Sequence, residues 1–333
     1  VQTCALPIFS ILGILGAFAL SPARIPLNAD AQSFQTVIPT GQELLARVFP
    51  VSMSAAALDG EYLMPLVILG IVLGLGLAFD RSVTKPLNAI ADAASRTMWQ
   101  INGFIVELFP VALIVLSAAT VSGIKGILRL NLYANLLTVL LIEALIVALV
   151  VLPLVLLAHN HKANPYKTLY ALLGPSLVGL VGGHALVPTG VLAKHLKDSL
   201  GIKRRAGALS LPLALSFGRA GSALVSATSF IVVLSSYSGL GLGSGTVAWM
   251  MLFVPLSSLL LSAAPGSGPL TALVFLSAAY GRGFESGYLL MVPVALPLMA
   301  IASFLDALCA GCVARLAAGA EGYAEEKAVR HFI

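Results

Sequence analysis

Residues Leu260–Leu270 read LLSAAPGSGPL, and they place two prolines and two glycines within residues 265–269. The flanking residues 247–260 and 270–279 are apolar enough to lie in lipid. Because lipid cannot satisfy exposed backbone groups, a broken helix persists in a membrane only inside protein or beside a water-filled cavity. The segment therefore predicts the tip of a re-entrant hairpin whose freed backbone groups face a polar site and whose glycines let it open as a gate.

The composition predicts an all-α polytopic membrane protein. Of 333 residues, 59% are hydrophobic and only 10% are charged, and the mean hydropathy is +0.98. Soluble domains average about 45–50% apolar and about 25% charged residues. A pI of 9.2 would suggest nucleic acid in a soluble protein. Here it indicates basic cytoplasmic loops, and no nucleic-acid partner is expected.

The cysteines and the first residues give two further expectations. Cys309 and Cys312 form a C-x-x-C inside an apolar run, which favours small-residue helix packing over redox chemistry. Residues 1–8, VQTCALPI, match the in-frame translation of a common sequencing adapter, so we expect an artefact there. Residues 9–20 are then expected to be the remnant of a transmembrane helix.

A second broken segment lies upstream of the first. The apolar run 169–191 is interrupted at 182–188, GGHALVP. Each break is followed by a full span, which predicts a hairpin at 166–200 with a helix at 206–234, and a hairpin at 247–282 with a helix at 284–319. Two such units of opposite orientation form an inverted repeat. Broken segments at matching positions of two repeats are the best sequence pointer to a transporter's binding site.

Basic residues predict the orientation. Of the 19 Lys and Arg residues, 13 fall on one side of the predicted topology, five on the other, and Arg219 within the membrane. The positive-inside rule then makes the charged tail, residues 321–333, cytoplasmic. We expect a multi-pass protein of the inner or plasma membrane.

Several short motifs resemble those of the dicarboxylate/amino acid:cation symporter family, which includes the glutamate transporters. They are Asn102-Gly103 with FPVAL at 109–113, Pro188, LPL at 211–213, APGSG at 264–268 and FLD at 304–306. The resemblance implies a glutamate-transporter-like fold with two re-entrant helical hairpins, assembled as a homotrimer. It also implies a scaffold at residues 42–125 and a transport domain at 126–320 that moves like an elevator. The family's first two helices and most of its third have no counterpart here.

The chain departs from the family at its sodium sites. The family's Asn-Met-Asp-Gly-Thr motif reads Gly218-Arg219-Ala220-Gly221-Ser222 here, and a second sodium-binding Asp falls at Ala317. A third site, built mostly from backbone carbonyls, is expected around Ser216 and Ser258–Leu261, with Arg219 nearby opposing a cation. No enzymatic cofactor or metal is expected. The coupling ion is Na⁺ or H⁺, with sodium coupling weakened or replaced by protons.

The resemblance also implies a substrate site. Asp306 corresponds to a residue that meets the substrate's amino group, whereas an Arg that binds acidic side chains falls at Cys309 and an Asn that binds the carboxylate falls at Val313. The loss at Cys309 disfavours an acidic side chain and the retained Asp306 favours an amino group, so a neutral amino acid is expected. The full predicted set is His184, Ser222, Pro265, Gly266, Ser267, Gly268, Asp306, Cys309 and Val313.

Three charged or titratable residues leave alternatives open. Arg219 is either the structural partner of Asp306 or a fixed positive charge where sodium sits in the family. His184 is a proton carrier, a substrate contact or a hydrogen-bonded filler. Glu143 is a proton site or faces a polar crevice.

The leading hypothesis is a secondary transporter for a small amino acid or dicarboxylate, acting on a small-molecule substrate across the bilayer. The alternative is a degenerate homologue that senses substrate or leaks it passively. The loss of the family's sodium-binding side chains favours this alternative. An intramembrane enzyme is disfavoured, because the only His after Ser267 is His331 in the tail and the last four spans offer only Asp306 as an aspartate.

Overall fold

The computed structural model describes residues 2–26, 63–79, 82–127, 130–159, 164–238, 243–261, 268–325, 327–329 and 332. Within these ranges the chain is helical, and its only β-pairing is a single bridge between Ile202 and Ala324. Four helical stretches are long and apolar enough to cross a membrane: Lys85–Lys125, Leu130–His159, Arg204–Tyr237 and Gly287–Ala320. The predicted all-α polytopic membrane fold is therefore confirmed.

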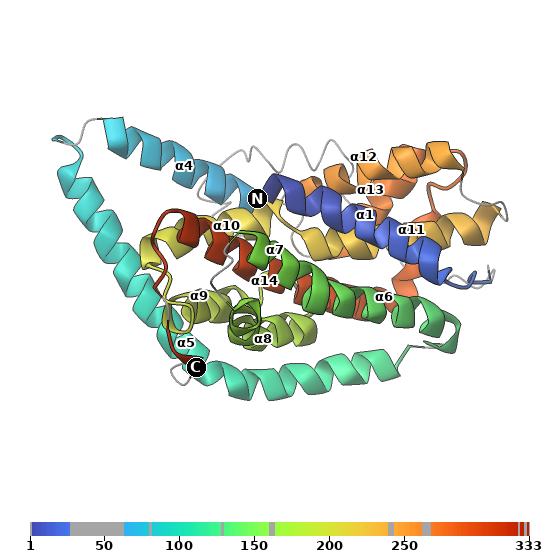
Figure 1. Ribbon diagram of the computed structural model, residues 1–333, viewed down its shortest axis with the longest axis horizontal. Coiled ribbons are helices and arrows are strands. Elements are labelled where there is room, and N and C mark those ends of the chain that lie inside the picture. Colours follow the sequence, from blue (N-terminus) through green and yellow to red (C-terminus); the bar gives the residue numbers. More distant parts are fainter. Residues whose placement is uncertain are drawn as a thin grey trace.

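Helices α1 and α4 differ in how closely they pack against the rest of the structure. Helix α1 (Gln2–Leu20) includes the residues expected to be an artefact and lies against α11. Helix α4 (Leu63–Phe79) diverges from the other helices (Figure 1). The predicted loop and apolar stretch within 27–62 lie outside the described residues.

Helix α5 (Lys85–Lys125) is one continuous helix of 41 residues. It bends around the outside of the molecule and none of its residues is buried (Figure 1). At 1.5 Å per residue it is about 60 Å long, about twice the hydrocarbon thickness, so only part of it can cross.

The next span is continuous but irregular. It begins as a 3₁₀ turn, η1 (Leu130–Tyr133), and continues as α6 (Ala134–Ile146). A π-helical turn, η2 (Val147–Val151), then leads into α7 (Leu152–His159). This agrees with the long span predicted from 130 to 158.

The first broken segment folds as two helices, α8 (Pro165–Gly182) and α9 (Thr189–Asp198), packed against each other. Asn164 caps α8 by accepting a hydrogen bond from the Tyr166 N–H at 3.0 Å, and Pro165 occupies the first turn. Gly183 ends α8 with φ +59°, a left-handed conformation that favours glycine.

The remaining helices follow the predicted order. Helices α10 (Arg204–Phe217) and α11 (Ala220–Ser238) are separated by a break at Gly218 and Arg219. Helices α12 (Ser244–Leu260) and α13 (Gly268–Tyr280) flank the second broken segment, whose residues 262–267 lie outside the described ranges. A 3₁₀ stretch, η4 (Gly287–Val294), leads into the last helix, α14 (Ala295–Ala320).

Helix α14 forms the centre of the packing, and glycines let its neighbours approach it. It contacts α8, α10, α11 and α13. A Cβ atom on Gly221 of α11 would lie 2.9 Å from the Asp306 nitrogen, and one on Gly179 of α8 would lie 2.8 Å from the Ser303 carbonyl oxygen. Both helices therefore approach the backbone of α14 more closely than any larger residue allows.

Candidate functional site

Asp306 lies in the middle of α14 and is only 2% exposed. Its carboxylate meets the first turn of α11, where the Ser222 N–H donates to Oδ1 at 3.1 Å and Ser222 Oγ donates to Oδ2 at 2.7 Å. A helix N-terminus carries a partial positive charge and free N–H groups, so this is a favourable place for an anion. Gly221 permits the approach, because a side chain there would collide with Leu305 and with the backbone of α14.

Arg219 occupies the break before α11 and is 1% exposed. It interacts electrostatically with Asp306. Its carbonyl oxygen accepts a hydrogen bond from Ser258 Oγ of α12 at 2.8 Å. Ser216, three residues earlier, is fully buried, and its hydroxyl has no hydrogen-bond partner within the described part of the chain. Ser216, Arg219 and Ser258 are therefore all buried, and Ser258 is bonded to the backbone carbonyl of Arg219 and not to its guanidinium.

This arrangement fits a metal cation poorly. Gly218, Ala220 and Ala317 offer no side-chain oxygen, and the basic residue Arg219 is buried in the same segment. No group of three or more His, Cys, Asp or Glu side chains comes together among the described residues. Hard cations prefer several oxygen ligands, with carboxylates among them.

A small cavity opens beside Asp306. It is lined by Gly183, His184, Ala185, Ser222, Gly268, Pro269, Met299, Ala302, Ser303 and Asp306. Both broken segments thus contribute to one site, together with α11 and α14. The cavity volume is about 10 Å³, which is room for about one water molecule. A substrate can enter only if the lining segments separate.

The cavity contains four of the predicted substrate-binding residues: His184, Ser222, Gly268 and Asp306. The imidazole Nδ1 of His184 accepts a hydrogen bond from the Leu186 N–H at 3.1 Å, which holds the ring within its own turn. Gly268 has φ +46°, so glycine is favoured there.

Other predicted residues lie elsewhere. Cys309 is buried on α14 and Val313 lies one turn further along, and neither lines the cavity. Pro265, Gly266 and Ser267 lie outside the described residues.

Ser303 is a site residue that the motif comparison did not identify. It is 2% exposed, it lines the cavity, and its hydroxyl has no hydrogen-bond partner among the described residues. It precedes Asp306 by three positions, so the two side chains share a face of α14. That spacing could have identified it from the sequence.

Glu143 lies apart from this cavity, at the junction of α6, α1 and α11. It is 4% exposed, so it does not face a crevice. Thr228 Oγ1 of α11 lies 2.8 Å from Glu143 Oε2 and 3.2 Å from the carbonyl oxygen of Gly13 in α1.

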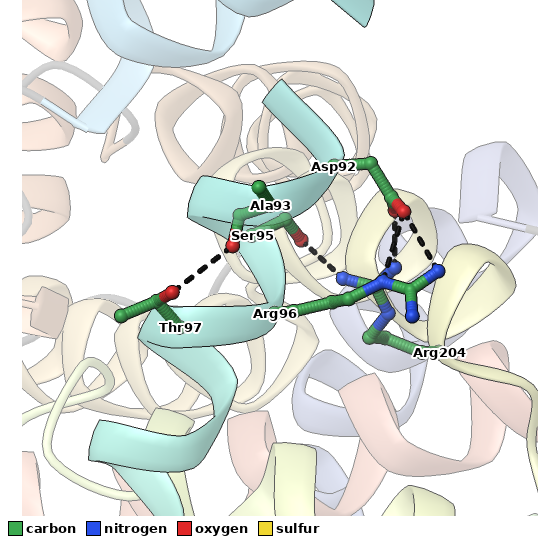
Figure 2. Close-up of polar contacts among 6 residues, drawn as sticks. All are labelled: Asp92, Ala93, Ser95, Arg96, Thr97 and Arg204. Atoms are coloured by element: carbon green, nitrogen blue, oxygen red, sulfur yellow. Dashed lines mark hydrogen bonds and ion pairs between the residues drawn. The ribbon is translucent and has the colours of Figure 1, made fainter. Parts of the chain in front are cut away.

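A larger cavity of about 770 Å³ lies between α4, α5 and α10. Two of its charged residues are paired with each other, as Figure 2 shows: Arg204 of α10 pairs with Asp92 of α5 and donates to Ser95 Oγ at 2.7 Å. Arg96 Nε also donates to Asp92 at 2.9 Å. The cavity at Asp306 is the better candidate, because its polar groups are buried and converge.

Known proteins resemble this chain over most of its length. The model of the sodium:dicarboxylate symporter family matches residues 3–317. Serine/threonine transporters SstT of Acinetobacter baumannii strains AYE, AB307-0294 and AB0057 are each 28% identical over 236 residues. The aligned region is 71% of this chain and 53% of each relative. The chain thus spans about half the length of the curated relatives it matches.

Proposed function

The chain belongs to the sodium:dicarboxylate symporter family, and on that premise we propose that it is a secondary transporter of a small neutral amino acid. The family consists of transport proteins, not enzymes. The observation that carries the proposal is the burial of Asp306 in a closed cavity between the two broken segments. A carboxylate there can bind an ammonium group, and no Lys or Arg side chain of the described residues lines the cavity to hold a second acidic group.

The groups that line the cavity support an amino acid substrate. The ammonium group is bound by Asp306, and the hydroxyls of Ser222 and Ser303 supply hydrogen bonds beside it. The absence of Arg at Cys309 disfavours an acidic side chain on the substrate. The similar proteins from A. baumannii carry the name serine/threonine transporter, and serine and threonine are small neutral amino acids, as proposed here.

The mechanism follows from the two broken segments. The helix pairs α8–α9 and α12–α13 act as re-entrant hairpins. The tip of the second hairpin, Pro265–Gly268, is the gate that must open to admit substrate. Residues 126–320, together with α1, form the transport domain, and residues 42–125 form a scaffold. The assembly is a homotrimer, the transport domain moves as an elevator, and the C-terminus is cytoplasmic.

Sodium coupling is weakened or replaced by protons. Arg219 supplies a fixed positive charge in the segment 218–222 that corresponds to the family's sodium-binding motif, and this charge opposes a sodium ion there. His184 contacts the substrate at the tip of the first hairpin.

Uptake into liposomes tests the proposal. The reconstituted full-length protein is given labelled serine, threonine, alanine, glutamate and succinate under a sodium gradient, a proton gradient or no gradient. We expect accumulation of the neutral amino acids and not of succinate. Accumulation of succinate or glutamate alone would contradict the proposed substrate class.

The second candidate is a sensor or passive leak, favoured by the lack of side-chain oxygens at Gly218, Ala220 and Ala317. It predicts substrate binding, measured by calorimetry, without accumulation under either gradient.

A further inference from the structure

A buried carboxyl group lies outside the proposed substrate site. Glu143 of α6 is covered by α1 and α11 and has one side-chain neighbour that can form a hydrogen bond, Thr228. Helix α1 closes over it at Gly16, where a Cβ atom would lie within 2.9 Å of Glu143 Cγ and Cδ. Glu143 Oε1 has no hydrogen-bond partner among the described residues.

The number of protons available to Glu143, Thr228 and Gly13 indicates whether Glu143 is protonated. A threonine hydroxyl has one proton to donate, yet Thr228 Oγ1 lies within hydrogen-bond distance of two acceptors, Glu143 Oε2 at 2.8 Å and the Gly13 carbonyl at 3.2 Å. If Glu143 is ionised, only one of these bonds forms. If Glu143 is protonated, Oε2–H donates to Thr228, and Thr228 donates to Gly13, so both form at once.

The charge of the surroundings also favours the protonated form. Helices α1 and α11 contain no charged residue, and Glu143 is the only one in α6. The other titratable groups on the helices and turns packed against α6 are Cys4, Tyr133, Tyr237, Asp306, Cys309, Cys312 and Arg315. An ionised carboxylate buried without a cation costs several kcal/mol, in the order of magnitude found for charges inside membranes.

A metal cation does not fit this place. Three oxygen-bearing groups converge there, on Glu143, Thr228 and Gly13, whereas hard cations such as Ca²⁺ take about six to eight oxygen ligands. The closeness of Gly16 to the carboxyl group leaves no room for further ligands on that side.

We infer that Glu143 is the proton-binding group of this transporter and that the bound proton completes the hydrogen-bonded chain from Glu143 through Thr228 to Gly13. The inference rests on the proposed transport function. Thr228 follows Ser222 by six residues on α11, which is about 9 Å along the helix. The proton site and the substrate site therefore share one rigid element, and loss of the proton would loosen α1 from the helix that supports Asp306.

Transport by a Gln variant tests the role in coupling. Glu143→Gln keeps the shape of the protonated group and can still donate to Thr228, but it cannot release a proton. We expect exchange of labelled for unlabelled serine within about threefold of wild type and a loss of at least about tenfold in proton-driven accumulation. Asp198→Asn, which changes a carboxylate outside both sites, serves as the control. Undiminished proton-driven accumulation by Glu143→Gln, or wild-type accumulation driven by sodium alone, would overturn the role in coupling.

Infrared spectroscopy tests proton binding without relying on transport. The purified protein is titrated from neutral to alkaline pH, and the carbonyl band of protonated carboxylic acids is followed. We expect the band at neutral pH to vanish in Glu143→Gln, to persist in Asp306→Asn and to shift in Thr228→Val. A band that persists in Glu143→Gln contradicts the inference even if serine is transported. A Glu143 band in a protein that transports nothing would overturn the proposed function and leave proton binding supported.

Discussion

At the scale of single residues, the site depends on Asp306 being held rather than merely buried. Two hydrogen bonds from Ser222 and the N-terminus of α11 fix the carboxylate, and Gly221 permits that approach. A carboxylate fixed in this way is prepared to receive an ammonium group without rearrangement, which is the main advantage of a preorganised site.

Asp306→Asn tests the charge at this position. The amide keeps the shape of the carboxylate but loses its negative charge, and breaking one partner of a buried charge pair costs about 2–5 kcal/mol, or at least about tenfold in affinity. We expect the apparent KM for serine to rise by at least that factor. Asp198→Asn should leave KM unchanged, and an equal rise in both variants would indicate a general effect on folding.

Ser303→Ala tests the residue that the motif comparison missed. Its hydroxyl has no hydrogen-bond partner among the described residues, so removing it should not destabilise the protein. A hydrogen bond to substrate would be lost, at about 0.5–1.5 kcal/mol. We expect a several-fold rise in KM with an unchanged unfolding temperature, and an unchanged KM would exclude Ser303 from substrate contact.

At the scale of elements, α5 holds the first hairpin by polar contacts instead of a buried apolar face. Asn102 Nδ2 donates to the Gly190 carbonyl at 3.0 Å, and Thr120 Oγ1 donates to the Val181 carbonyl at 2.7 Å. The pairing of Arg204 with Asp92 connects the same helix to α10 (Figure 2). Such contacts are weak and separable, which suits the proposed elevator movement of the transport domain past the scaffold.

Arg204→Ala therefore should affect rate more than stability. Partly exposed ion pairs contribute about 0–1 kcal/mol, so the unfolding temperature should barely change, whereas the turnover number for serine should change because the contact breaks in each cycle. A double-mutant cycle with Asp92→Ala isolates the pair. A large fall in stability with unchanged turnover would contradict this view of the α5–α10 contact.

Gly221→Ala tests the opposite kind of contact, between α11 and α14. The added methyl would collide with Leu305 and the backbone of α14, and overpacking of this kind costs about 1–3 kcal/mol. We expect a lower unfolding temperature by fluorescence-detected chromatography. Gly319→Ala, on α14 where nothing lies within 4 Å, is the matched control. Equal effects of the two substitutions would show that the close approach is not what matters.

At the scale of the whole molecule, the basic residues of α9, α10 and the tail gather at one end. Lys327 Nζ donates to the Asp198 carbonyl at 2.8 Å, and the Lys203 N–H donates to the Tyr323 carbonyl at 2.9 Å. The positive-inside rule predicts that this end is cytoplasmic.

Labelling with a membrane-impermeant maleimide tests that orientation. Lys327→Cys should react only when the cytoplasmic side is opened, and Arg282→Cys should react from outside. Cys309 and Cys312 are buried and should contribute little background, while the variants are compared with a parent that lacks Cys4. Reaction of Lys327→Cys in intact cells would reverse the topology.

Much of the element order could be predicted from the sequence. Helices α8 and α9 lie within the segment 166–200 and at its edge, where Pro165 and Gly183 act locally as start and stop signals. The unbroken length of α5 could not be predicted, because its first part contains charged residues and no long apolar run. The set of Gly13, Gly16, Glu143 and Thr228 could not be assembled, since Gly13 and Thr228 lie 215 positions apart and only tertiary structure joins them.

That separation has a consequence for biosynthesis. Ribosomes add about 5–20 residues per second, so Glu143 enters the membrane several seconds before Thr228, 85 positions later, exists to bind it. Gly13 of α1 is synthesised about 10–40 seconds before Thr228 of α11, its hydrogen-bond partner, at the same rate. During this interval the nascent chain carries an acidic group in lipid with no partner, so the proton on Glu143 serves insertion before it serves transport.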